Sequence, residues 1–259
     1  MTDRVILGPT RHPMPAEGRS RRVLQLPGIG PLEIWINQVG PDAQGKPDLF
    51  ILKFPGTASR AEDPTDVFAR WWPDLRIEIW AVNPPGYGGS GGRASLRHIP
   101  AMSHSALQAL VSAAGGVPVV VVGESLGCVS ALHLSARNSV DALLLRDPPP
   151  LRETIRSRHR TGLLGRAAAL LADQVPGELD VIENAARSDA PAVMLLSQRD
   201  RVVPFELQCR VVDAYRGLSQ HLVLPEADHG DPPSPSEYGE FKDLTGWLWG
   251  AVTAPPIGD

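Results

Sequence analysis

The sequence predicts an α/β fold in which a mostly parallel central sheet carries helices on both faces and a small helical cap. From residue 48 to residue 252, short apolar segments alternate with longer segments of helical periodicity. Strands that alternate with helices pair in parallel, because each helix carries the chain back across the sheet. The segment 117–122 is also apolar throughout, which is typical of a strand buried on both faces.

Composition limits the function classes that the chain can belong to. The formal net charge of −4 over 259 residues gives no polyelectrolyte signal, so we expect no nucleic-acid partner. No segment is long and apolar enough to span a bilayer, and the N-terminus lacks the apolar region of a secretory signal. These features favour a cytoplasmic protein. Cys128 and Cys209 lack the spacing of a metal site or a disulfide framework, so we expect two buried small side chains.

The first part of the chain reads as an arm followed by an antiparallel hairpin. Residues 1–20 are rich in proline, arginine and glycine, and they predict an arm on the surface. Two strands, 22–26 and 32–39, surround a Pro-Gly turn and form the hairpin. Segment 48–54 is a compact apolar strand, and 66–72 is a short helix.

From residue 76 onward the alternation is regular except at one insertion. The predicted strands are 76–82, 117–122, 142–145, 192–196 and 221–224, and the predicted helices are 96–114, 128–137, 205–215 and 241–252. Residues 151–188 interrupt this pattern with helical segments. We therefore expect a single domain over residues 1–259, with 151–188 as a small cap inserted over the carboxyl edge of the sheet.

The predicted cap begins with a cluster of basic side chains. The cluster comprises Arg152, Arg156, Arg158 and Arg160. Such a cluster could hold an anionic group of a substrate, for example a phosphate. The alternative is a solvated helix face, which is the more common role of a run of charges.

A serine lies at the junction of the central strand and the helix that follows it. Residues 123–127 read Gly-Glu-Ser-Leu-Gly, and Ser125 stands at the apex of a strand–turn–helix. This turn exposes the serine hydroxyl above the sheet, and the flanking glycines leave room for the neighbouring backbone. The pattern alone is weak, since roughly one chain in ten of this length contains it by chance. A second match at residues 88–92 follows no strand and reads as a flexible loop.

No organic cofactor or metal is expected. Residues 86–91 match the spacing of a dinucleotide-binding loop, but prolines break the preceding strand and no helix opens within the loop. The chain also lacks a phosphate-binding Walker loop, the HExxH pattern and paired cysteines.

A serine nucleophile needs a base, and His229 is the best candidate among seven histidines. Histidine titrates near neutral pH and can take the hydroxyl proton. His229 follows the last predicted strand in a polar loop, at the carboxyl edge where open α/β sheets place their sites. The other histidines fall in the arm, in helices, in the basic segment or at the wrong end of a strand.

The base in turn needs a carboxylate that orients its imidazole. Asp200 leaves the strand 192–196 just before a proline that can open the next helix, and it is our first candidate. Asp147 follows strand 142–145 at the same edge and is an alternative. Asp228 adjoins His229, but sequence neighbours in a loop rarely present their side chains to each other.

An oxyanion hole completes the expected site. The backbone N–H of Leu126 opens the helix after the serine and points toward the reacting atoms. The turn at residues 55–57 follows strand 48–54, and its glycine allows close backbone approach, so the N–H of Thr57 is the second candidate donor. The alternative for this segment is a simple turn.

Together these residues resemble the α/β-hydrolase superfamily over nearly the whole chain, from about residue 22 to residue 252. The resemblance rests on Phe-Pro-Gly-Thr at 54–57, the elbow at 123–127, Asp-Arg-Val-Val-Pro at 200–204 and Asp-His-Gly at 228–230. The order of serine, aspartate and histidine along the chain is the order of that superfamily. The resemblance also accounts for the glycine-rich turn that begins near residue 83.

The resemblance implies a serine hydrolase that acts on a carboxylic ester or thioester through an acyl-enzyme. Ser125, His229 and Asp200 would form the catalytic triad, with Leu126 and Thr57 in the oxyanion hole and a small molecule as the partner. A non-catalytic binding module on the same fold remains an alternative, since fold does not imply function. Acyl transfer, cofactor-free haloperoxidase chemistry and lyase chemistry are further alternatives. The sequence identifies neither the substrate, with its acyl-chain length, nor the oligomeric state.

Overall fold

The computed structural model describes residues 6–12, 14–41, 45–63, 67–158 and 162–254. Its strands lie close to the predicted ones, with ends that differ by up to two residues. They are β1 (Ser20–Leu26), β2 (Gly30–Val39), β3 (Leu49–Phe54), β4 (Ile77–Asn83), β5 (Val119–Glu124), β6 (Ala142–Arg146), β7 (Ala192–Ser197) and β8 (Ser219–Leu224).

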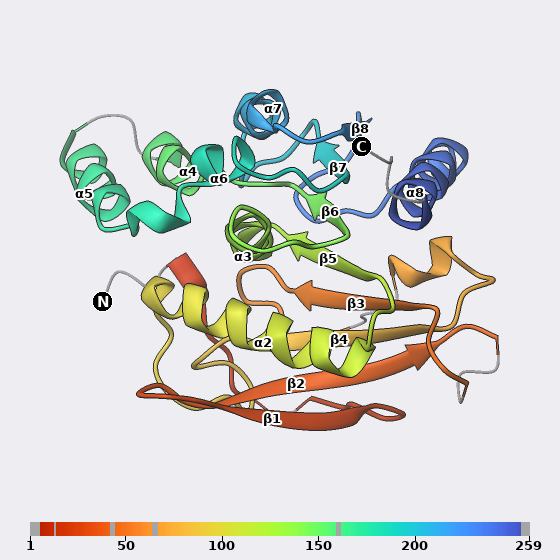
Figure 1. Cartoon of the computed structure of the whole chain (residues 1–259). Coiled ribbons are helices and arrows are strands. Elements are labelled where there is room, and N and C mark those ends of the chain that lie inside the picture. Colours follow the sequence, from red (N-terminus) through yellow and green to blue (C-terminus); the bar gives the residue numbers. More distant parts are fainter. Residues whose placement is uncertain (1–5, 13, 42–44, 64–66, 159–161, 255–259) are drawn as a thin grey trace.

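Within the described residues, the eight strands form one sheet in the order β1-β2-β4-β3-β5-β6-β7-β8. The six strands from β4 to β8 along this order run parallel to one another. Only β2 runs the other way and pairs antiparallel with β1 and β4. The predicted hairpin and the mostly parallel sheet are therefore confirmed, and Figure 1 shows the sheet running through the whole molecule.

Helices follow the strands in the predicted alternation. They are α2 (Ile99–Ala114), α3 (Leu126–Ser135), α4 (Leu151–Arg158), α5 (Gly162–Asp173), α6 (Val181–Ala185), α7 (Phe205–Ala214) and α8 (Tyr238–Thr253). The helix predicted at 66–72 is shorter, since its regular part is the 3₁₀ turn Ala69–Trp71, and residue 66 lies outside the described part of the chain. The N-terminal turn of the helix predicted at 96–114 is also 3₁₀ (Leu96–His98).

Two apolar cores lie on the two faces of the sheet. Alternate side chains of β3 separate them: Phe50 and Leu52 contribute to one core, Leu49 and Ile51 to the other. Helices α2, α3, α6 and α7 cover the first core, whereas α8 and the segment around Phe68 cover the second. Both faces of the parallel strands are thus buried, which explains why their sequences are almost continuously apolar.

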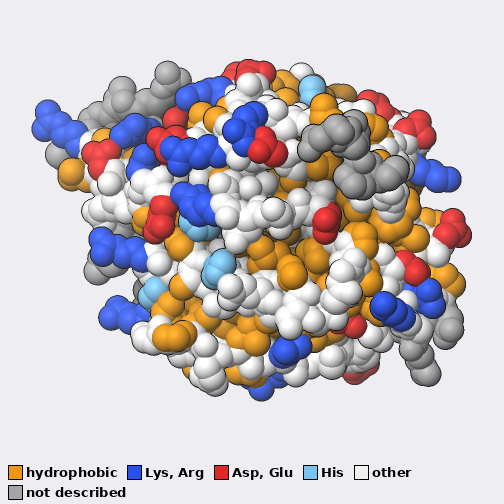
Figure 2. Space-filling view, viewed as in Figure 1, with side chains coloured by type: hydrophobic (Ala, Val, Ile, Leu, Met, Phe, Trp, Pro, Cys, Tyr) orange, Lys and Arg blue, Asp and Glu red, His pale blue; other side chains and the backbone are white. Residues whose placement is uncertain are grey.

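Between β6 and β7 the described part of the chain forms three α-helices, α4, α5 and α6, within the segment that we expect to be a cap. In Figure 1, α4 and α5 lie toward the end of the molecule to which the parallel strands point. Arg152 pairs with Asp180 at 3.1 Å and Arg156 pairs with Asp173 at 2.6 Å. Positive and negative side chains accordingly lie beside one another over these helices in Figure 2.

These ion pairs involve two arginines of the basic cluster at the start of the predicted cap. Two of its four arginines already have carboxylate partners, as expected for a solvated helix face. The side chain of Arg158 and the whole of Arg160 lie outside the described residues. The described part of the cluster therefore gives no support to an anion site.

The N-terminal arm differs from the prediction. Residues 6–12 do not merely lie on the surface, because the side chain of Leu7 is 4% exposed and belongs to the first apolar core. The prediction was wrong here because an arm without periodicity can still bury one apolar side chain when tertiary contacts fix its backbone. No helix in the described part of the chain is long and apolar enough to cross a lipid bilayer.

Candidate active site

Ser125 stands at a strained turn between β5 and α3. Its backbone has φ 49° and ψ −118°, a combination that L-residues rarely adopt. The two flanking glycines are required by close contacts: a Cβ on Gly123 would lie 2.7 Å from Cys128 Cα, and one on Gly127 would lie 2.0 Å from Phe54 O. The predicted strand–turn–helix is therefore present, and the steric reason given for its glycines is confirmed.

The backbone on either side holds this turn in place. The N–H of Ser125 donates to the carbonyl of Arg146 on β6 at 2.8 Å, and the carbonyl of Ser125 accepts from the N–H of Cys128 at 2.8 Å. Leu126 is the first residue of α3, so its N–H has no acceptor within the helix. The positive end of the α3 dipole therefore lies beside the serine. The thiol of Cys128 is buried and donates to backbone carbonyls, as expected of a packed side chain.

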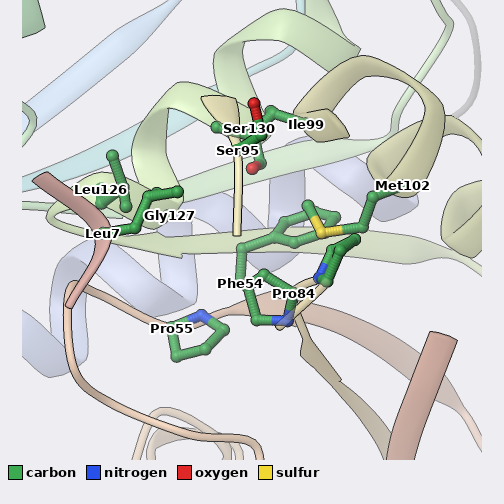
Figure 3. Close-up of a pocket in the computed structure, with 11 residues that line it drawn as sticks. Leu7, Phe54, Pro55, Pro84, Ser95, Ile99, Met102, Leu126, Gly127 and Ser130 are labelled. Atoms are coloured by element: carbon green, nitrogen blue, oxygen red, sulfur yellow. The ribbon is translucent and has the colours of Figure 1, made fainter. Parts of the chain in front are cut away.

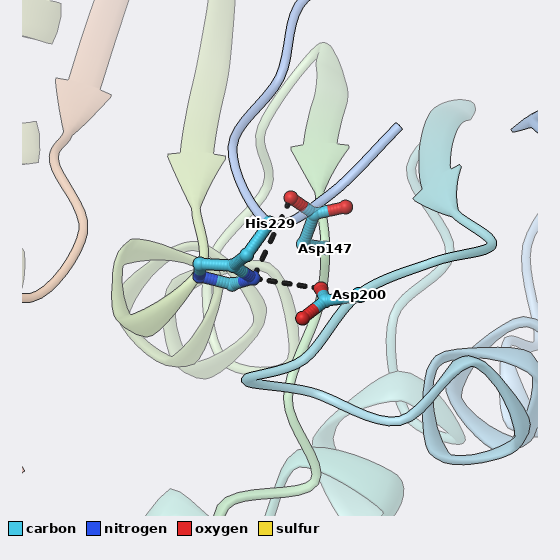
Figure 4. A group of neighbouring side chains, drawn as sticks. All are labelled: Asp147, Asp200 and His229. Carbon is cyan, nitrogen blue, oxygen red and sulfur yellow. Dashed lines mark hydrogen bonds and ion pairs between the residues drawn. The ribbon is translucent and has the colours of Figure 1, made fainter. Parts of the chain in front are cut away.

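The structure brings Ser125, His229 and Asp200 into one hydrogen-bonded row. His229 Nε2 lies 2.8 Å from Ser125 Oγ, and His229 Nδ1 lies 2.7 Å from Asp200 Oδ2. The carboxylate only accepts, so Nδ1 carries the proton and Nε2 is free to accept from the serine hydroxyl. These are the three residues that the sequence placed after β5, β7 and β8, and Figure 4 shows His229 and Asp200 facing each other.

Asp200 is held by donors that sequence reasoning did not identify. Its Oδ1 accepts from the N–H groups of Val202 and Val203, each at 2.7 Å. Its Oδ2 also accepts from Gln208 Nε2 at 3.0 Å. Gln208 is fully buried and lies on α7. The sequence offered one sign of this role: Gln208 lies three positions before the apolar Val211, so it is a polar residue on the inward face of the helix.

Asp147, the alternative acid, has a different position. Its nearer oxygen lies 3.7 Å from His229 Nδ1, which is beyond hydrogen-bond distance. Instead, its Oδ1 accepts from the N–H of Ser197 at 3.1 Å and its Oδ2 accepts from the N–H of Gly230 at 2.7 Å. Asp147 is buried and has φ 50°. It thus joins the ends of β6 and β7 to the loop that carries His229.

Asp228, the third candidate for the orienting acid, accepts hydrogen bonds from backbone N–H groups. Its Oδ1 accepts from the backbone N–H groups of Arg201 at 3.0 Å and of His229 at 2.8 Å. It makes no contact with the imidazole ring among the interactions of the described residues. The sequence argument against a loop neighbour as the orienting acid is therefore consistent with the geometry.

Burial and neighbouring charge act on His229 in opposite directions. Burial lowers the pKa of His229, but the hydrogen bond that its Nδ1–H donates to Asp200 and the negative charges of Asp200 and Asp147 raise it. The net pKa lies above the ordinary histidine value. The pKa of Asp147 lies above its ordinary value, because burial and the negative charge of Asp200 raise it. The hydrogen bonds from the N–H groups of Gly230 and Ser197 lower it by less. The imidazolium form of His229 is thus favoured by two carboxylates.

Asp147, Asp200 and His229 carry the types of ligand atom that can bind a metal ion. Ligand atoms of Asp147, Asp200 and His229 lie within 4.8 Å of one another. However, N–H donors of the protein engage all four carboxylate oxygens, as described above. A metal ion would have to displace these bonds, so the donor set fits an oriented imidazole better than a cation site.

The predicted oxyanion loop lies against the serine. A Cβ on Gly56 would stand 3.3 Å from both Glu124 O and Ser125 Cβ, so this glycine permits the close approach. The Thr57 hydroxyl donates to the carbonyl of Ile6 at 3.3 Å. The loop therefore lies beside Ser125, and the roles of the Thr57 and Leu126 N–H groups remain predictions.

A buried row of charges supports the turn from the other face of the sheet. Glu124, directly before the serine, pairs with Lys53 of β3 at 3.0 Å and with Arg146 of β6 at 2.6 Å. The Arg146 guanidinium also lies over the ring of Phe68 at 5.7 Å. All three charged side chains are largely buried. They join the three central strands at the point where the turn begins.

The second Gly-x-Ser-x-Gly match has a structural role. Ser90 is buried, donates to the carbonyl of Asn83 at 2.6 Å and accepts from the N–H of Glu33 at 2.8 Å. Residues 86–91 form turns and open no helix. Ser90 therefore does not stand at a strand–turn–helix junction like that of Ser125.

An apolar pocket lies beside the start of α3 at Leu126, the residue that follows Ser125, and Figure 3 shows the side chains that line it. Its lining comes from the arm, the oxyanion loop, the turn after β4, and helices α2 and α3: Leu7, Phe54, Pro55, Pro84, Pro85, Ser95, Ile99, Met102, Leu126, Gly127 and Ser130. None of these residues belongs to segment 151–188. In the described part of the chain, the segment that we expect to form a cap therefore does not line this pocket.

Comparison with known proteins gives a partial sequence match. No protein-family model matches the chain. An uncharacterized protein of Mycobacterium tuberculosis is 32% identical over 160 residues, which is 61% of this chain and 55% of that protein. The match thus spans about half the length of this curated relative.

Solved structures give a match over most of the chain. The acetyl xylan esterase from Paenibacillus sp. R4 superposes with a TM-score of 0.67 at 15% identity, covering 91% of this chain and 89% of the esterase. The mouse alpha/beta hydrolase domain-containing protein 10 superposes with a TM-score of 0.68 at 14% identity, covering 90% of this chain and 100% of that protein. At these identities the likeness is one of fold.

Proposed function

The chain has the α/β-hydrolase fold, and we propose that it is a serine hydrolase that cleaves a carboxylic ester or thioester. The observation that carries the proposal is the hydrogen-bonded row from Ser125 Oγ through His229 to Asp200, at 2.8 and 2.7 Å. A serine at a strained turn, a base and an orienting carboxylate in this geometry are the parts that nucleophilic acyl transfer requires. The similar structure named as an acetyl xylan esterase is in keeping with this chemistry.

In the proposed mechanism Ser125 Oγ attacks the carbonyl carbon while its proton passes to His229 Nε2. The carbonyl oxygen becomes an oxyanion, which the N–H groups of Leu126 and Thr57 would stabilise. The tetrahedral intermediate collapses, the bond to the leaving group breaks, and His229 returns the proton to the departing oxygen or sulfur. Water, deprotonated by His229, then attacks the acyl-enzyme, and the carboxylic acid leaves as Ser125 regains its proton.

The charges around His229 suit this sequence of steps. Asp200 stabilises the imidazolium that forms in each half-reaction, and Asp147 adds a second negative charge nearby. The mechanism needs no metal ion and no organic cofactor. We further propose that the chain folds as one domain and that helices α4–α6, within residues 151–188, form a cap over the site.

Labelling with a fluorophosphonate probe tests the proposal. We expect the wild-type chain to react at one serine and Ser125→Ala to lose the label, together with about 10⁶-fold in ester turnover. Ser90→Ala is the matched control, because Ser90 occupies the second copy of the motif. If folded wild-type protein failed to label and cleaved no nitrophenyl ester or acyl thioester, a non-catalytic binding module would become the better interpretation.

A further inference from the structure

We propose that Leu7 of the N-terminal arm determines the acyl-chain specificity of this site and restricts the enzyme to esters of short-chain carboxylic acids. This inference rests on the proposed function. It assigns to the arm a part of the substrate site, and it names the substrate class by the size of its acyl group.

The arm is fixed by hydrogen bonds to the two loops that border the pocket. The carbonyl of Leu7 accepts from the N–H of Ala58 at 3.3 Å and from the hydroxyl of Tyr87, which is itself buried. The carbonyl of Thr10 accepts from the N–H of Gly88 at 2.9 Å. Removing the arm would leave the buried Tyr87 hydroxyl without its acceptor, which costs free energy, so these hydrogen bonds hold the arm against the pocket.

A second set of contacts holds the arm farther along. The Arg11 guanidinium donates to the carbonyls of Gly86, Ser90 and Gly92 at 2.9–3.1 Å. At the other end, Gly8 lies so close to the oxyanion loop that a Cβ would be 3.3 Å from Thr57 Cγ2. The backbone on both sides of Leu7 is therefore positioned, and its side chain is held in the pocket.

The place of the pocket identifies which part of the substrate enters it. Its lining includes Pro55 and the start of α3 at Leu126, which is the oxyanion side of Ser125, and it includes no residue of the His229 loop. In the mechanism the leaving group takes its proton from His229 Nε2, so the leaving group lies on the side of His229. The acyl group must then extend to the other side, into the pocket.

The lining predicts a short, apolar acyl group. Leu7, Phe54, Ile99 and Met102 present large apolar side chains, and the cavity that they border has a volume of about 20 Å³. Leu7 is the only one of these four that precedes the first strand of the sheet. Its isobutyl group takes up room that a longer acyl chain would need.

The test is a series of nitrophenyl esters from acetate to octanoate, with kcat/KM measured for each. We expect the wild-type enzyme to prefer acetate to butyrate over hexanoate by at least about tenfold. In Leu7→Ala, which removes three carbon atoms, the ratio of hexanoate to acetate should rise about tenfold. In Leu7→Val, which removes one, it should rise about threefold, because each smaller side chain leaves more space for the acyl chain. Varying the alcohol at constant acetyl group should leave the ratio of variant to wild type unchanged.

Leu218→Ala is the matched control, since Leu218 is 74% exposed and should leave the chain-length ratio within about twofold. Active-site titration with the fluorophosphonate corrects each rate for the folded fraction, and Leu7→Val carries the test if Leu7→Ala does not fold. An unchanged chain-length ratio in a labelled Leu7 variant would overturn the assignment of Leu7. Absence of both labelling and esterase activity in the wild type would instead refute the proposed function.

Discussion

The Oδ2 atom of Asp147 accepts a 2.7 Å hydrogen bond from the backbone N–H of Gly230, the residue that follows His229. The carboxylate at the end of β6 thereby positions the loop that carries the candidate base, while Asp200 at the end of β7 contacts the imidazole itself. Two carboxylates thus act on one histidine in different ways, one through the ring and one through the backbone.

Replacing the two carboxylates should have unequal effects. Asp200→Asn removes the acceptor of the His229 Nδ1 proton and should lower kcat by about 10⁴-fold, because the imidazole then loses its correct tautomer. Asp147→Asn keeps the size of the side chain but can accept only one of the two N–H bonds, so we expect a loss of about 10- to 100-fold. Steady-state hydrolysis of nitrophenyl acetate measures both. Equal losses, or a larger loss in Asp147→Asn, would contradict the assigned roles.

The pH dependence of kcat/KM should report the raised pKa of His229. The base must be neutral to accept the serine proton, so activity should fall as the pH decreases through a pKa above the ordinary value of about 6.5. Since the charge of Asp147 contributes to raising this pKa, Asp147→Asn should move the acid limb of the profile to lower pH. A limb that stayed in place or moved to higher pH would show that Asp147 has no electrostatic effect on His229.

The glycine after the serine turn should be intolerant of a methyl group. Gly127→Ala would place a Cβ 2.0 Å from the carbonyl oxygen of Phe54, a backbone atom that cannot move away freely. We expect a loss of about 3 kcal/mol or more in the free energy of unfolding, and weaker fluorophosphonate labelling. Gly246→Ala in α8 is the control, because nothing lies within 4 Å of its Cβ position and alanine favours a helix by about 0.5–1 kcal/mol. Similar unfolding midpoints for the two variants in urea would argue against the steric explanation.

The buried charges below the serine turn should be important for stability. Glu124→Gln would leave the Lys53 and Arg146 cations buried without their carboxylate, which costs about 3–5 kcal/mol when a buried pair is broken. The surface pair of Glu183 and Arg187 offers a control: both side chains are about 60% exposed, so Glu183→Gln should change stability by less than about 1 kcal/mol. Urea unfolding of both variants measures the two changes in the free energy of unfolding. A small effect of Glu124→Gln would mean that water solvates the two cations.

Local sequence was sufficient to predict those candidate site residues whose position depends only on where a strand ends. Ser125, Asp200 and His229 each follow a strand of the parallel sheet, and the carboxyl ends of parallel strands meet at one edge. Apolar patterns therefore predicted both the sheet and the three residues that it brings together. The glycines at 123 and 127 could also be explained in advance, because a sharp turn between a strand and a helix leaves no room for Cβ atoms.

Long-range contacts could not be predicted in the same way. No periodicity marks Leu7, and its burial depends on hydrogen bonds from loops about 50 and 80 positions away in the sequence. Gln208 reaches Asp200 only because α7 packs beside β7. The choice between Asp200 and Asp147 was likewise left to the structure, since both follow neighbouring strands and the distances of 2.7 and 3.7 Å to His229 depend on side-chain packing.

By itself, the sequence determined the fold class, the serine turn and the order of the chemical groups, because these depend on hydrophobic period and on the sterics of a few consecutive residues. Only the tertiary structure decided which carboxylate meets the imidazole, how the base loop is held and which residues line the pocket. These features depend on distances between segments that are far apart along the chain, and such distances are set by the packing of the whole domain.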